Sequence, residues 1–91
     1  MHNKNIKEVK VATKTDPKLL ATSIIYSLKE GKHIKLIAFG QAVMVLTKAV
    51  CMVNLFKDDT ITIDFQPSMQ YVTGSDLSIH NAVVFNISIK E

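Results

Sequence analysis

The sequence of 91 residues predicts an α/β fold, a two-layer sandwich with two helices on one face of a four-stranded mixed sheet. Three observations support this prediction. Two apolar runs are each followed by a segment with helical periodicity, and a long alternating stretch closes the chain as a hairpin. The predicted element order is therefore β-α-β-α-β-β. The length suits one domain with a thin core, which we place over residues 1–91.

The first strand and helix are predicted from residues 6–30. "IKEVKVAT", 6–13, alternates as a strand and places Val9 and Val11 on one face. A helix follows over 17–30, and Gly31 is suited to end it in a left-handed conformation. Its apolar stripe consists of Leu20, Ile24 and Leu28, with Ala21 and Ile25 beside them.

The second strand and helix differ from the first pair in their apolar content. "HIKLIAF", 33–39, predicts a central strand, and Gly40 turns the chain into a helix over 41–57. The polar residues of that helix form a narrow stripe, so apolar surface remains after it has covered the sheet. A second subunit is the economical explanation, because monomers rarely expose such patches. We predict a homodimer whose interface includes Val45, Met52, Leu55 and Phe56.

The last third of the chain predicts a long hairpin. "TITIDF", 60–65, alternates as a strand, and Pro67 predicts a bulge or an edge position. Residues 69–72 can resume the strand, and "TGSD", 73–76, is a turn. A final strand over 77–90 places these apolar residues mostly at alternate positions: Ile79, Val83, Phe85, Ile87 and Ile89.

Charge is distributed unevenly along the chain. Residues 1–35 carry eight lysines and three acidic residues, a net +5, and residues 36–57 carry +2. Residues 58–91 carry −4. All basic side chains apart from the histidines are lysines, which act as point charges and lack the guanidinium fork that reads guanine. A nucleic-acid partner would therefore be bound through its backbone with little sequence preference.

The turn "TKTDPK", 13–18, has two interpretations. Lys14 and Lys18 flank a helix start, whose unpaired N–H groups and dipole favour a phosphate. Alternatively, Thr15 or Asp16 caps the helix, Pro17 occupies its first turn, and the lysines only maintain solubility. An aspartate cap would occupy the same amides and repel phosphate.

Catalytic chemistry is weakly represented. The three histidines have no partners at metal-ligand spacing, and Cys51 is expected to be a buried small side chain of the second helix. The three glycines are too scattered for a phosphate loop. We therefore expect a protein that is not an enzyme, with no metal, cofactor or small-molecule substrate. The apolar runs are too short or interrupted for a membrane span, and one cysteine fits a cytoplasmic location.

Two segments resemble the bacterial stage V sporulation protein S family. "KVATKTDPKLLATSIIYSLKEG", 10–31, resembles the start of that family, and "AVMVLTKAVCMVNLF", 42–56, is similar to its second helix, including the triplet Lys48-Ala49-Val50. The resemblance implies an Alba-like fold. It also implies a small dimeric nucleic-acid binder with basic contacts in the first turn, at the second helix start and in the final hairpin.

The family pattern carries over to several positions. Lys14 matches the lysine of the first turn, and Gly40 falls close to a glycine-containing turn, where "FGQ" replaces a "GAG"-like pattern. The hairpin departs from the pattern because "TGSD" contains an aspartate and no lysine. The expected nucleic-acid contacts are Lys10, Lys14, Thr15, Lys18, Gly40, Gln41 and Lys48.

The resulting hypothesis is a cytoplasmic homodimer that binds DNA or RNA backbone non-specifically and acts in sporulation or developmental regulation. The alternative is a protein–protein interaction module of the same architecture with no nucleic-acid binding. A steep dependence of affinity on salt would favour the first hypothesis.

Overall fold

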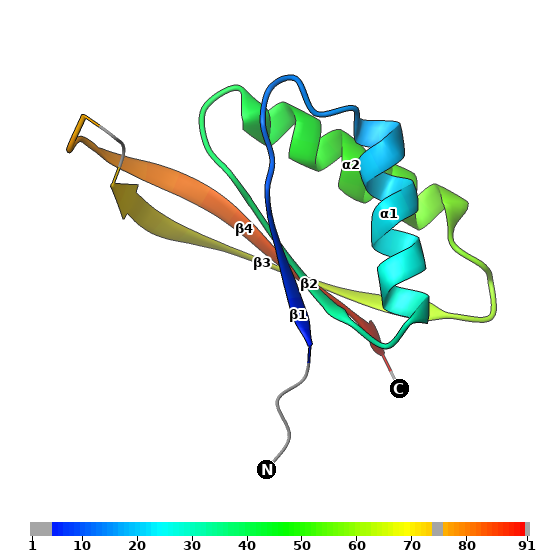
Figure 1. The fold of residues 1–91 in the computed structure, drawn as a ribbon. Helices are drawn as coiled ribbons and strands as arrows, with labels where there is room; N and C mark the ends of the chain where they lie inside the picture. Colours follow the sequence, from blue (N-terminus) through cyan, green and yellow to red (C-terminus); the bar gives the residue numbers. More distant parts are fainter. Residues whose placement is uncertain (1–4, 74–75, 91) are drawn as a thin grey trace, which may run out of the picture.

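The computed structural model describes residues 5–73 and 76–90 and confirms the predicted element order (Figure 1). Four strands form one sheet in the order β1-β2-β4-β3, with β1 and β2 parallel and the other pairs antiparallel. Both helices lie on one face of this sheet (Figure 1). The elements are β1 Ile6–Lys10, α1 Pro17–Lys29, β2 His33–Ala38, α2 Ala42–Phe56, β3 Thr62–Thr73 and β4 Ile79–Lys90.

Strand β1 ends at Lys10, three residues earlier than predicted. The Val11 N–H still donates to the Ile37 carbonyl at 2.8 Å, but the next residues close a turn. In that turn, the Thr15 N–H donates to the Ala12 carbonyl at 3.1 Å and the Ala12 N–H donates to Thr15 Oγ1 at 3.0 Å. These bonds satisfy the Ala12 backbone within the turn and so end its pairing with β2.

Helix α1 follows the predicted amphipathic pattern. Leu20, Ala21, Ile24 and Leu28 are buried, and Gly31 leaves the helix with φ +84°. Strand β2 is central as predicted, between β1 and β4. Helix α2 buries Ala42, Leu46, Ala49 and Val53 against the same core.

Cys51 is exposed, which corrects the prediction that it is buried. Apolar residues surround α2, so the sequence pattern does not distinguish its inner from its outer face. At 100° per residue, Cys51 lies opposite the buried row of Leu46 and Val53.

The β3–β4 hairpin is longer and more regular than predicted. β3 runs without interruption through Pro67, which pairs with Phe85. β3 is an edge strand with β4 as its single neighbour. The missing N–H of proline therefore leaves no second strand without a hydrogen-bond donor. The predicted turn includes Gly74 and Ser75, which lie outside the described residues.

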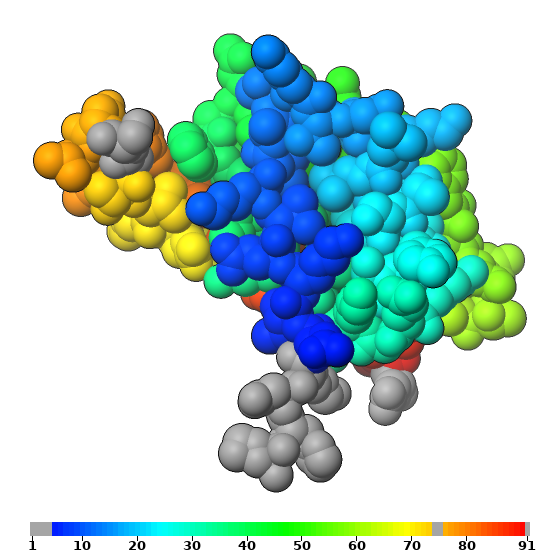
Figure 2. All heavy atoms as spheres, in the orientation of Figure 1, coloured from blue at the N-terminus to red at the C-terminus, as the bar shows by residue number. Residues whose placement is uncertain are grey.

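The end of this hairpin extends beyond the helices (Figures 1 and 2). We call this part, residues 69–73 and 76–83, the arm. The alternation predicted for β4 holds at Phe85, Ile87 and Ile89, which contribute to the core. Ile79 on the arm is exposed, because no helix covers the sheet there.

The two faces of the sheet differ in composition. Val11, Ile34, Leu36 and Ile87 lie on the face covered by helices, where they form the main core. The opposite face, which we call the open face, carries a smaller apolar cluster of Ile37, Ala82 and Val84, with Val72 packed against it. Charged and amide side chains surround that cluster. They occupy other positions of the strands that point to the same face.

Candidate nucleic-acid interface

The start of α1 is closed by its own cap. Asp16 has extended backbone angles, and its Oδ1 accepts the Lys18 N–H at 2.9 Å. Pro17, which has no N–H, occupies the first helical position. The cap predicted from the sequence is therefore confirmed. A phosphate at this turn would have to contact lysine side chains, since Asp16 occupies the Lys18 amide and adds a negative charge.

Thr15 holds the turn in shape. Its hydroxyl accepts the Ala12 N–H, and its side chain is half-buried. This bond leaves Lys14 at the outer part of the turn with an exposed side chain. Thr15 thus positions Lys14, whereas the sequence alone offered it as a cap or a direct contact.

The start of α2 is built differently. Gly40 has φ +63°, and Gln41, the residue before the helix, makes no side-chain capping bond. Instead, the Val43 N–H donates to the Gly40 carbonyl at 3.1 Å and the Met44 N–H to the Gln41 carbonyl at 3.2 Å. The first turn of α2 contains no acidic residue, so no side chain there opposes an anion.

Parallel pairing brings the two helix starts to the same end of the sheet. Lys10 is in register with Ile37, so the chain segments that follow β1 and β2 leave the sheet together. Figure 1 shows these two connections next to each other, one leading into α1 and the other into α2. Lys14, Thr15, Gly40 and Gln41 therefore share one end of the molecule, which is the end where open α/β sheets bind ligands.

Exposed lysine side chains lie at this end of the molecule, on β1, in the turn and on α1. Lys10 ends β1 and projects on the open face, whereas Lys18 lies in the first turn of α1. Both are exposed, as is Lys14 between them. We call Lys10, Lys14 and Lys18 the basic turn. Other lysines lie elsewhere, such as Lys32, which pairs with Glu30 at 3.4 Å.

Lys48 lies on α2 and is not one of the three lysines of the basic turn. It is exposed in the middle of α2, about 9 Å along the helix axis from Ala42. Among the four residues predicted for a dimer interface, Val45 and Met52 pack partly on the core. Leu55 and Phe56 are exposed, Leu55 by 77%. Lys48 lies on the same outward side as Leu55, as the helical repeat requires.

The arm differs from the basic turn in chemistry. Its exposed large side chains are apolar: Met69, Tyr71, Leu77 and Ile79. Asp76 is the charged group at its described end, and hydrogen bonds from Ser78 lower the pKa of that carboxyl. The arm therefore lacks the cations that contact with a phosphate backbone requires.

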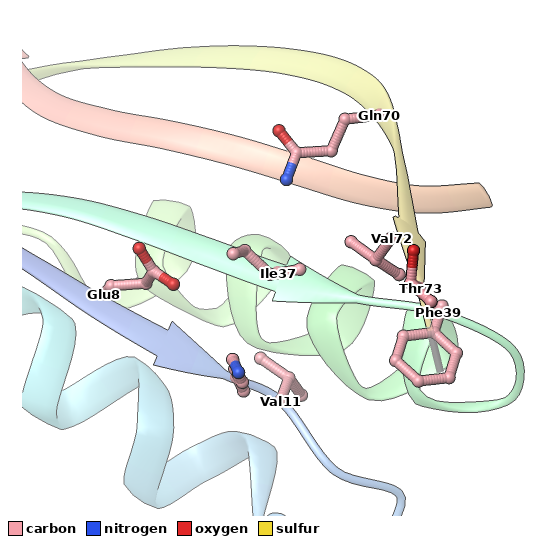
Figure 3. Close-up of a pocket in the computed structure, with 8 residues that line it drawn as sticks. Glu8, Val11, Ile37, Phe39, Gln70, Val72 and Thr73 are labelled. Atoms are coloured by element: carbon pink, nitrogen blue, oxygen red, sulfur yellow. The ribbon is translucent and has the colours of Figure 1, made fainter. Parts of the chain in front are cut away.

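Sequence reasoning missed a hollow on the open face. Figure 3 shows Gln70 on β3 directed toward Glu8 and Ile37, with Val72, Thr73 and Phe39 at one end. The hollow has a volume of about 310 Å³, and Lys10 and Val11 complete its lining. Strand parity could have placed Glu8, Lys10 and Ile37 on one face. It could not have shown that twist brings Gln70 over them.

In the part of the chain that the structure describes, no group of three or more His, Cys, Asp or Glu side chains could hold a metal ion. In residues 5–73 and 76–90, no helix combines the length and apolar character needed to cross a membrane.

The fold is shared with a known structure. Alba from Thermoplasma volcanium superposes with a TM-score of 0.63 and 11% sequence identity, over 92% of this chain and 99% of that chain. This similarity shows an Alba-like fold. No curated protein is similar enough in sequence to count as a match. The family model described as Stage V sporulation protein S (SpoVS) matches residues 7–90, so the chain belongs to this family.

Proposed function

We propose that the protein is a non-catalytic nucleic-acid-binding regulator that acts as a homodimer in the cytoplasm. In this proposal it binds the phosphate backbone with low sequence specificity and serves sporulation or a related developmental process. The family name supports the developmental role, and the Alba-like fold supports the nucleic-acid partner.

The observation that carries the proposal is the basic turn beside two helix starts. Three exposed lysines within nine residues lie at the end of the sheet where β1 leads into α1 and β2 leads into α2. Flexible ammonium groups suit the phosphate backbone, which presents the same charges whatever the base sequence. The low specificity follows from the absence of arginine in the sequence.

The homodimer is supported by the outer side of α2. Met44, Cys51 and Leu55 are exposed there in the single chain, and Phe56 is exposed where the helix ends. A second copy that covered this side would remove apolar surface from water and would present the basic turn twice. Duplication of the site matters because each weak lysine contact adds to one salt-dependent affinity.

Fluorescence anisotropy with a labelled nucleic acid of random sequence tests the proposal at ~50 and ~200 mM salt. With about six phosphate contacts per dimer, affinity for duplex DNA should fall about a thousandfold between these salt concentrations. Lys14→Ala/Lys18→Ala should reduce the slope by about 0.9 for each lost contact.

The matched control is Lys29→Ala/Lys90→Ala, which removes the same charge from exposed positions outside the basic turn. This variant should keep the steep slope. If both double variants weaken binding equally, only net charge matters and the basic turn is not the site. If the wild type does not bind duplex or single strands at ~50 mM salt, nucleic-acid binding is excluded.

The apolar arm favours a second candidate function, a protein-interaction module. Tyr71 and Ile79 are exposed on the arm beyond the helices, and neither carries the positive charge that attracts a phosphate backbone. Such residues typically anchor protein interfaces. Binding to a protein partner that is insensitive to salt, is lost on Tyr71→Ala and is kept on Lys14→Ala/Lys18→Ala would support this second function.

A further inference from the structure

The hollow on the open face has the features of a small binding site. Its 310 Å³ lies at the lower end of the range for ligand pockets. Ile37 and, at one end, Val72 give it apolar lining, while polar groups reach it from β1 and from the far part of β3 (Figure 3). It therefore combines an apolar surface with a few convergent polar groups, as binding sites do.

An aromatic ring stands at one end of the hollow. Phe39 is 46% exposed, and its ring stacks on His80 with centroids 5.3 Å apart and an angle of 17° between the planes. Ser78 Oγ lies 2.8 Å from His80 Nε2 and 2.5 Å from Asp76 Oδ1, so hydrogen bonds orient the supporting ring. Phe39 is thus held in place from the arm. A held, exposed aromatic ring is the kind of platform on which nucleobases stack.

The polar groups of the hollow suit a neutral ligand with both donors and acceptors. Lys10 donates, Glu8 accepts, and the Gln70 amide does both. One cation and one carboxylate leave the hollow without net charge, so a free phosphate would meet Glu8 as well as Lys10. A nucleobase is neutral, aromatic and carries donors and acceptors on its edge. A glutamine amide can pair with an adenine edge through two hydrogen bonds.

The hollow adjoins the basic turn. Val11 lines the hollow, and Lys14 follows it by three residues, which limits their separation to about 11 Å. Lys10 belongs to both places. A strand with phosphates on Lys14 and Lys18 could therefore place a neighbouring base in the hollow. The site is on the opposite face of the sheet from α2, so a dimer formed through α2 would leave it open.

We propose that the hollow receives one unpaired base of a single-stranded nucleic acid, with stacking on Phe39 and hydrogen bonding to Gln70. This inference rests on the proposed nucleic-acid binding and specifies its substrate class. A base within a duplex is stacked and paired, so it cannot enter such a site without leaving the helix. The protein should therefore prefer single strands to duplexes of the same length.

The test compares fluorescent 12-mers by anisotropy at ~50 mM salt: dA12, a 12-mer of abasic sugars with the same phosphates, and a 12-base-pair duplex. dA12 should bind about tenfold more tightly than the abasic strand, because stacking of one base on an aromatic ring contributes on that scale. It should also bind more tightly than the duplex.

Variants assign this preference to the hollow. Phe39→Ala should bring dA12 binding close to that of the abasic strand and leave abasic binding unchanged. Tyr26→Ala is its control, because it removes an exposed aromatic residue on α1 away from the hollow.

Gln70→Leu should weaken dA12 binding by about threefold. Gln66→Leu is the control on the same face of β3, because Gln66 contacts Asp64 and does not line the hollow. If Phe39→Ala does not fold, Phe39→Leu removes the aromatic ring and keeps apolar volume.

Four results would overturn the inference. Equal binding of dA12 and the abasic strand, both dependent on salt, would leave the proposed function intact and exclude base insertion. Tighter binding of the duplex would do the same. A preference for dA12 that survives both Phe39→Leu and Gln70→Leu would place the base elsewhere. Absence of binding to all three probes would exclude the proposed function itself.

Discussion

The two helices begin at the same end of the sheet and cover the same face, yet they differ in their N-terminal caps and in the polarity of their outer sides. α1 has an aspartate cap, and most of its outer residues are polar. α2 lacks a side-chain cap and exposes Met44, Cys51 and Leu55 on its outer side. The difference teaches that the outer side of α1 suits contact with water, whereas α2 leaves apolar surface exposed in the single chain, which is the surface our proposed dimer would cover.

The largest expected effect comes from substituting Leu55 on α2, with Leu19 on α1 as the comparison. Both are leucines on outer helix surfaces, 77% and 68% exposed in the single chain. If α2 forms the dimer interface, Leu55→Glu would bury an unpaired charge there. The dimer dissociation constant should then rise at least ~100-fold, equivalent to about 2.7 kcal/mol. Light scattering during size-exclusion chromatography at micromolar concentration would measure it.

Leu19→Glu is the matched control on α1 and should leave the dimer intact. If the wild type is a monomer at micromolar concentration, or if both variants dissociate equally, α2 is not the distinguishing surface. Circular dichroism should show that both variants keep their helices, because neither leucine belongs to the core.

The glycines at the two helix ends offer a second contrast. Gly31 after α1 and Gly40 before α2 have φ of +84° and +63°, and a Cβ at either position would have no atom within 4 Å. Alanine at each should therefore lower the free energy of unfolding by about 1–2 kcal/mol, from backbone conformation alone. Urea unfolding would show this loss in both variants.

Nucleic-acid binding should separate these two variants. Gly40→Ala should weaken it several-fold if phosphate approaches the start of α2, whereas Gly31→Ala should not. Asparagine tolerates the left-handed conformation better than alanine and should recover part of the stability at both positions. Equal binding by the two alanine variants would contradict a role for Gly40 in binding.

Substitutions of Asp16 separate the effect of the α1 cap on stability from the effect of its charge on nucleic-acid binding. Asp16→Ala should cost about 1 kcal/mol and lower Tm by about 4–8 °C at constant protein concentration. Asp16→Asn should stay close to the wild type in Tm, because asparagine can accept the same Lys18 N–H. It should also bind nucleic acid several-fold more tightly, since it removes a negative charge beside Lys14 and Lys18. Gln41→Ala at α2 should not change Tm, because Gln41 makes no side-chain cap.

The sequence predicted most of the fold because local signals and global pairing agree. The Pro17 start, the Gly31 end and the single apolar stripe of α1 define that helix without tertiary information. The final hairpin followed from alternation, although Pro67 made one strand look like two, since sequence alone does not show which strand is at the edge. Cys51 was misplaced because apolar residues surround α2.

The candidate site was predicted only where it is local. Lys14, Thr15, Asp16 and Lys18 are neighbours in the chain, and the cap among them was one of the two interpretations offered. The hollow depends on Gln70 and Val72, which lie 60 or more residues after Glu8 and Lys10. Its shape comes from the twist of a long hairpin, a property that pairing patterns do not specify.

The smallest expected effect concerns the far ends of the same two helices. Asp58 follows α2, and its pKa is lowered, first because the Thr60 N–H donates to its Oδ1 at 3.1 Å and also because Lys29 of α1 and Lys57 are nearby. Since the folded pKa lies below the ordinary 3.8, this carboxylate stabilises the fold above that pH, and the contribution is lost as pH falls through the folded value. Carboxyl-carbon NMR titration should show Asp58 below 3.8 in the wild type and slightly higher, but still lowered, in Lys29→Ala.

A pKa of about 3.8 for Asp58 in the wild type would contradict its hydrogen bond from the Thr60 N–H. A pKa that Lys29→Ala leaves unchanged would show that the ends of α1 and α2 are electrostatically independent. In that case, the contrast between the helices would be confined to their starts and outer faces.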